Sequence, residues 1–148
     1  MKFRHFHIAL AALALVLAMP VDAQRLPTTN PGPHAAQING APGKVTEDIF
    51  PVRIVEINGR NIQPRQTIWL EPGRYEFRVL VDIPRGLSFP RSPADSRRWR
   101  QADPQTRREA LTIELEVEAG KTYQIRARYN SRETEEFAWS TVLWRIEE

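Results

Sequence analysis

The stretch Thr67–Ile83, TIWLEPGRYEFRVLVDI, constrains the fold of this chain more than any other. After Gly73 apolar and charged side chains alternate, and the apolar set is Tyr75, Phe77, Val79 and Val81. A period of two is the period of a β-strand, whose successive side chains point to opposite faces of a sheet. Pro72-Gly73 suits a type II turn, because proline presets φ and glycine tolerates a positive φ. The stretch therefore predicts a β-hairpin whose strands meet at Glu71-Pro72-Gly73.

Further segments also have the character of strands. They are 50–57, 109–118, 122–129 and 137–146. Asn58-Gly59 after the first of them is a strong hairpin signal, because both residues accept the positive φ of a type I′ turn. In 109–118 the predicted inward set is Leu111, Ile113, Leu115 and Val117. If 109–118 and 122–129 form a hairpin, the outward glutamates of the first would face Arg126 and Arg128 of the second.

The count of strands and their short connections predict an all-β fold, an antiparallel β-sandwich of six or seven strands over residues 45–148. Residues 84–108 interrupt the pattern with an arginine-rich insertion. Within it Ser92-Pro93 has the residues of a helix start, which predicts a short helix from Pro93 to about Ala102. Asp103-Pro104 would then start another turn.

Two segments precede the predicted sandwich. Residues 1–23 have a positive start, the short apolar run Ile8–Met19 and a small residue before Gln24, which predicts a cleaved signal peptide. Residues 24–44 are rich in proline and glycine, which predicts a flexible leader. The chain has no cysteine, which excludes disulfides and an acylated lipoprotein anchor. We therefore expect a periplasmic or secreted protein with no transmembrane segment after processing.

Three pieces of the chain carry a resemblance to a known group. They are ING at 57–59, LEPGRYEFRV at 70–79 and VEAGKTYQIRA at 117–127, followed by the strand that holds Trp139. In these pieces the chain resembles small exported bacterial β-sandwich modules, including the PEGA type. The arginine-rich insertion departs from that compact pattern. The resemblance implies binding or structural work on the cell envelope, and it supplies no catalytic residue.

The insertion is the strongest functional signal. Its predicted binding residues are Arg91, Arg97, Arg98, Trp99, Arg100, Arg107 and Arg108. A guanidinium group binds carboxylate and phosphate through two hydrogen bonds and stacks on aromatic rings. The expected partner is an envelope protein, an anionic glycan or a lipid headgroup, and no nucleic acid is expected. In the alternative interpretation the arginines pair with acids on the sheet and Trp99 caps the core.

Trp144 is the second signal. It has the opposite parity to Trp139, so one of the two should face away from the core and be able to stack on a sugar or a partner. An exposed tryptophan together with the row Glu114, Glu116 and Glu118 would suit a sandwich that binds or cleaves carbohydrate. The alternatives are a solvated glutamate row and a purely structural domain.

The sequence offers little support for catalysis, metal binding or phosphate binding. The one histidine beyond the predicted signal peptide is His34, inside the predicted leader, and the chain shows no glycine-rich phosphate loop. We therefore expect a non-enzymatic module with no cofactor and no metal.

Overall fold

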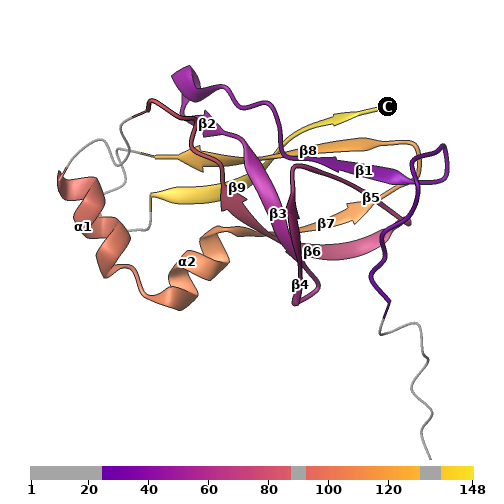
Figure 1. Cartoon of the computed structure of the whole chain (residues 1–148), viewed down its shortest axis with the longest axis horizontal. Helices are drawn as coiled ribbons and strands as arrows, with labels where there is room; N and C mark the ends of the chain where they lie inside the picture. Colours follow the sequence, from indigo (N-terminus) through magenta and orange to yellow (C-terminus); the bar gives the residue numbers. More distant parts are fainter. Residues whose placement is uncertain (1–24, 88–92, 131–137) are drawn as a thin grey trace, which may run out of the picture.

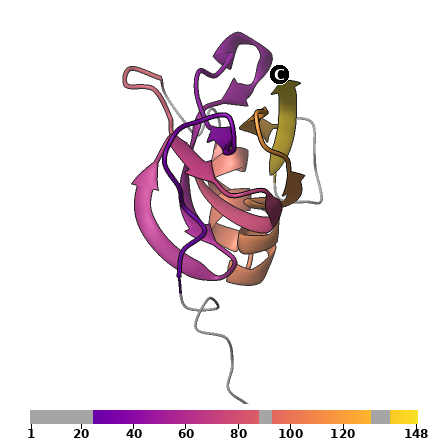
Figure 2. The same cartoon turned by 90° about the vertical axis from the view of Figure 1, so that its right-hand side faces the viewer.

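Two β-sheets packed face to face make up the protein (Figures 1 and 2). The computed structural model describes residues 25–87, 93–130 and 138–148. Figure 2 shows the layers from the end, with β9 in yellow and the magenta strands of the other sheet on opposite sides. The predicted all-β sandwich is confirmed. The predicted signal peptide, 1–23, lies outside the described residues.

Sheet B, the first layer, has four strands. Their order is β4 (Arg60–Arg65), β3 (Val52–Ile57), β6 (Gly73–Val81) and β7 (Thr112–Val117), and every neighbouring pair is antiparallel. The β3–β4 hairpin turns at Asn58-Gly59 with φ values of 48° and 75°, as the sequence predicts.

Sheet A, the second layer, is built around β8 (Thr122–Tyr129). β9 (Trp139–Glu147) pairs antiparallel along one side of β8. On the other side lie β1 (Ala36–Asn39), which is parallel, and β2 (Ile49–Phe50), which is antiparallel. β5 (Thr67–Leu70) pairs with the outer edge of β1.

The prediction of a flexible leader through Lys44 is wrong for residues 36–39. These residues form β1 between two other strands, and the side chains of Ala36 and Ile38 are fully buried. Composition misleads here because a strand of four residues needs only two apolar side chains on its inner face. The loop from β1 to β2 contains a 3₁₀ turn, Val45–Glu47.

The predicted hairpin at Glu71-Pro72-Gly73 is also wrong. β5 belongs to sheet A and β6 to sheet B, so the chain turns a corner between the layers. Gly73 has a φ of 158°, whereas a type II turn needs about +80° at that position. The turn at 119–121 is a corner too, because β7 lies in sheet B and β8 in sheet A.

At both corners a tyrosine hydroxyl forms a hydrogen bond with the backbone. The hydroxyl of Tyr75 donates a hydrogen bond to the carbonyl of Glu71 at 2.9 Å. The hydroxyl of Tyr123 accepts one from the backbone N–H of Glu118 at 3.0 Å. In each case the tyrosine lies just after the turn. Its hydrogen bond connects the strand that follows the turn to the acidic residue that precedes the turn. This geometry explains why LEPGRYEFRV and VEAGKTYQIRA look alike.

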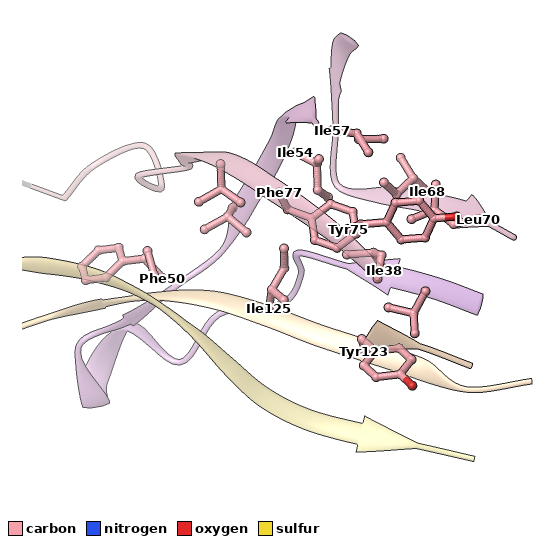
Figure 3. Close-up of a cluster of buried hydrophobic side chains, with 14 of the residues drawn as sticks. Ile38, Phe50, Ile54, Ile57, Ile68, Leu70, Tyr75, Phe77, Tyr123 and Ile125 are labelled. Atoms are coloured by element: carbon pink, nitrogen blue, oxygen red, sulfur yellow. The ribbon is translucent and has the colours of Figure 1, made fainter. Parts of the chain in front are cut away.

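Alternation predicts the inner faces of β6 and β7 correctly. Figure 3 shows side chains from both sheets, among them Phe77 and Ile125, pointing into the space between the layers. On β7 Val117 is buried, while Ile113 and Leu115 are half-buried against the core, as is Leu111 just before the strand. The inward assignment of this strand is therefore confirmed.

The insertion forms α1 (Pro93–Gln101), as the sequence predicts, and a second helix, α2 (Pro104–Ala110), where the sequence predicts only a turn. α2 also takes up residues 109–110, which the sequence pattern assigns to the start of the next strand. Figure 1 shows both at one end of the sandwich. Asp103 is the N-cap of α2, and its side chain accepts a hydrogen bond from the backbone N–H of Thr106 at 2.9 Å. Pro104 at the first helical position needs no hydrogen-bond acceptor.

Candidate functional site

A buried carboxylate on sheet B holds the insertion in place. In the register of β3 against β6, Ile54 lies opposite Val79 and Glu56 opposite Arg78, which leaves Val55 as an extra residue. Such a β-bulge reverses the facing of the residues that follow it. Glu56 therefore lies with Arg78 on the outer face of sheet B, and Ile57 is buried.

Two arginines bind this carboxylate. Arg78 Nε donates to Glu56 Oε2 at 2.5 Å, and Arg108 Nη2 from α2 donates to Oε1. Glu56 is only 3% exposed. Burial raises the pKa of its carboxyl, but the hydrogen bonds and charges of the two arginines outweigh burial and hold that pKa below its ordinary value. Glu56 is therefore a charged anchor for the insertion at neutral pH.

Further contacts fix α2 to both layers. The hydroxyl of Thr141 on β9 donates to the carbonyl of Ala110 at 3.1 Å. The backbone N–H of Val79 on β6 donates to the carbonyl of Leu111 at 2.9 Å. The end of α2 is thus tied to sheet A by one bond and to sheet B by the other, and α2 is a fixed part of the surface.

The predicted binding arginines separate into different environments. Arg108 is engaged by Glu56, which is the pairing that the alternative interpretation expected, although with another acid. Arg98 and Arg107 are half-buried, and Arg97 and Arg100 are exposed. Arg91 and the side chain of Trp99 lie outside the described residues.

Arg97 and Arg100 are three residues apart on α1, so they share one face of the helix. Neither forms an ion pair with another side chain in the described part of the chain. These two side chains place two positive charges side by side toward solvent, where an anionic partner can reach them.

The glutamate row does not face the arginines that the sequence suggested. β7 pairs with β6, so Glu114 forms its ion pair with Arg74 Nε, and both side chains are well exposed. The expectation that Arg126 and Arg128 oppose this row is wrong, because β8 lies in the other sheet. Glu114 and Glu116 belong to a solvated face of sheet B.

The structure assigns different environments to the two tryptophans of β9. Trp139 is 3% exposed and packs against the rings of Phe50 and Tyr129, with ring centroids 5.1 and 5.0 Å away. Trp144 is 37% exposed and lines a cavity on sheet A. No residue of the insertion lines this cavity, so Trp144 and the arginines of α1 form two separate surfaces. Alternation could predict that the two tryptophans face opposite ways, but not which faced out.

Comparison with known protein families, with curated proteins and with solved structures gives no match. Within residues 25–87, 93–130 and 138–148, no three histidine, cysteine or acidic side chains gather as metal ligands. Neither helix of this part of the chain is long and apolar enough to cross a membrane.

Proposed function

We propose that this protein is an exported, non-enzymatic module that binds an anionic polysaccharide of the cell envelope through the exposed arginines of α1. One observation carries the proposal. Arg108 and Arg78 satisfy Glu56 and so attach the insertion, whereas Arg97 and Arg100 extend to solvent without an ion pair to a described side chain. Within residues 25–87, 93–130 and 138–148 their charges contribute to no ion pair, and we propose that they bind a partner.

A polysaccharide fits this protein better than the other anionic partners. Trp144 presents half-exposed indole on a second surface, and a flat apolar ring matches the C–H face of a sugar. Binding without cleavage fits the glutamate row, because its solvated carboxylates have the environment of ordinary surface acids. Arginine suits the role because its planar fork matches a carboxylate in two hydrogen bonds.

The test compares two double variants with the same loss of charge. Arg97→Ser with Arg100→Ser removes the proposed surface, and Arg65→Ser with Arg128→Ser removes two exposed arginines from strands. Each protein is passed over immobilised polygalacturonate and over a neutral glucan at low salt. We expect the first variant alone to lose capture on polygalacturonate, and salt to weaken the capture of the unmodified protein.

If both double variants lost capture on polygalacturonate equally, net charge alone would drive the capture and the proposal would fail. Circular dichroism of both variants should match that of the unmodified protein, because none of the four arginines forms an ion pair with another side chain that the structure describes. Stronger capture on vesicles of anionic lipid than on polygalacturonate would replace the polysaccharide with a membrane surface.

A further inference from the structure

A cavity of about 180 Å³ lies on the outer face of sheet A. Three elements line it: β8 with Gln124 and Arg126, the loop 42–44 with Ile49, and β9 with Trp144 and Arg145. Ile125 and Ala127 of β8 face the core, so Gln124 and Arg126 point away from it. The cavity therefore gathers an indole, an amide and several cationic groups.

A β-bulge on β9 assembles one side of the cavity. Leu143 lies opposite Ile125 and Arg145 opposite Gln124, which leaves Trp144 as the extra residue. Without it, strict alternation from Leu143 would turn Arg145 toward the core side of the sheet. The bulge instead aims Trp144 and Arg145 at the same face, and bulges of this kind commonly re-aim side chains at functional sites.

Arg126 is a buried cation, only 1% exposed. Its Nε donates to the carbonyl of Pro42 at 2.5 Å, and its Nη1 donates to the carbonyls of Asn39 and Ile125 at 2.8 and 2.7 Å. Nη2 donates to Gln124 Oε1 at 3.1 Å. Four of the five N–H groups of a guanidinium are thus directed to neutral oxygens.

The charge of Arg126 lacks a close counter-ion in the described part of the chain, where no carboxylate lies within ion-pair distance of it. Burial lowers the pKa of the guanidinium, and the more distant Glu147 acts weakly in the opposite sense. An arginine nevertheless stays protonated in proteins. The cavity that Arg126 lines therefore has a positive charge that a bound anion would compensate.

The loop wall of the cavity is held in place. A Cβ atom on Gly40 would lie 2.1 Å from the carbonyl oxygen of Val52, and one on Gly43 would lie 2.4 Å from Cδ of Pro51. Asn39 Oδ1 also accepts a hydrogen bond from the backbone N–H of Ala41 at 2.8 Å. Such close backbone packing means that the cavity exists before any ligand arrives, which lowers the entropy cost of binding.

Two further cations stand at the rim. Lys44 Nζ lies 2.5 Å from Glu47, and Arg145 Nη1 lies 3.5 Å from Glu147. All four side chains are exposed, and exposed ion pairs of this kind contribute little to stability. Both cations are therefore free to turn to a ligand at small cost.

We propose that this cavity binds one carboxylate-bearing sugar ring, a uronic acid residue, with the ring on Trp144 and the carboxylate toward Arg126 and Arg145. The inference depends on the proposed function, since such a ring would be one unit of the anionic polysaccharide. The cavity volume of about 180 Å³ limits the ligand to a single sugar ring. Pockets for larger organic ligands measure about 300–1,000 Å³. Gln124 provides an amide for a sugar hydroxyl.

The experiment is a calorimetric titration of the purified protein with galacturonate, glucose, acetate, inorganic phosphate and N-acetylglutamate. We expect galacturonate to bind more tightly than the other four, because only it combines a pyranose ring with a carboxylate. Trp144→Ala should weaken galacturonate binding about tenfold or more, as the loss of an aromatic stacking surface does elsewhere. Lys44→Gln with Arg145→Gln should weaken it and reduce its dependence on salt.

The matched control is Arg128→Gln, an exposed arginine of β8 outside the cavity, which should leave the affinity unchanged. Arg126 stays as it is, because its replacement would also release the loop. Glucose binding as tightly as galacturonate would overturn the proposal, as would equal binding of acetate or phosphate. Tighter binding of N-acetylglutamate would indicate an acidic peptide and overturn it too.

The two proposals fail separately. Galacturonate binding in the cavity, with no capture on polygalacturonate, would refute the surface on α1 and support the cavity. Capture that needs Arg97 and Arg100, without any galacturonate binding, would refute the cavity alone.

Discussion

Replacement of Glu56 by glutamine tests whether one buried carboxylate fixes the insertion to the sandwich. Glutamine keeps the shape of the side chain but removes its charge, and its amide –NH2 turns N–H donors toward one of the two guanidinium groups. Loss of one partner from a buried ion pair costs about 3–5 kcal/mol of stability. The side chains of Arg78 and Arg108 are 31% and 47% exposed, so water solvates the cations that remain.

We therefore expect Glu56→Gln to lower the free energy of unfolding by about 2–3 kcal/mol, below the range for fully buried pairs. Urea unfolding followed by circular dichroism measures this value. With a slope of about 2 kcal/mol/M, the midpoint should fall by roughly 1 M. Glu114→Gln is the control, because its exposed pair with Arg74 should contribute less than about 1 kcal/mol.

The effect should depend on pH in a defined direction. The folded state lowers the pKa of Glu56 from its ordinary value of 4.5. The ionised Glu56 carboxylate therefore contributes its full stabilisation above pH 4.5. This stabilisation is lost as the pH falls through the lower pKa that Glu56 has in the folded state. The stability difference between the two proteins should be constant near neutral pH and shrink in acid. Equal midpoint shifts for Glu56→Gln and Glu114→Gln would refute the reasoning, as would a difference that persists unchanged in strong acid.

Three further predictions concern the fold. Gly40→Ala should destabilise by about 3 kcal/mol, because its Cβ would lie 2.1 Å from a backbone oxygen, whereas Gly32→Ala meets open space and should leave the thermal midpoint unchanged. Trp139→Ala should cost about 3–5 kcal/mol in urea unfolding, and Trp144→Ala, at the exposed cavity, much less; similar costs would contradict the assigned environments. Deletion through Asn39 should abolish the β-sheet signal in circular dichroism, because it removes β1 (Ala36–Asn39) from the middle of sheet A; a folded product would contradict that role.

Local patterns predict the elements well and their partners poorly. Alternation in 74–81 and 111–117 locates two strands and their inner faces, since side-chain direction depends only on the strand itself. Turn chemistry at Glu71-Pro72-Gly73 predicts a reversal of the chain, and the chain does turn there. Whether the next strand pairs with the previous one or crosses to the other sheet depends on contacts far away in sequence. The β1 strand escapes prediction for the same reason, because its partners lie 28–34 and 85 residues further along the chain, at Thr67–Leu70 and Thr122–Gln124.

Both candidate surfaces depend on something that alternation hides, namely a single extra residue in a strand. Strict alternation places Glu56 on the same face as Ile54, and places Arg145 on the same face as Leu143. The bulges at Val55 and Trp144 send these two charged residues to the outer faces instead. A charge that would otherwise face the opposite sheet is thus available to bind, Glu56 to Arg78 and Arg108, and Arg145 to a ligand. An apolar strand with one charge of the wrong parity is therefore a signal for a bulge. In this chain one bulge lies at the anchor of α2 and the other lies beside the cavity that we propose to bind a ligand.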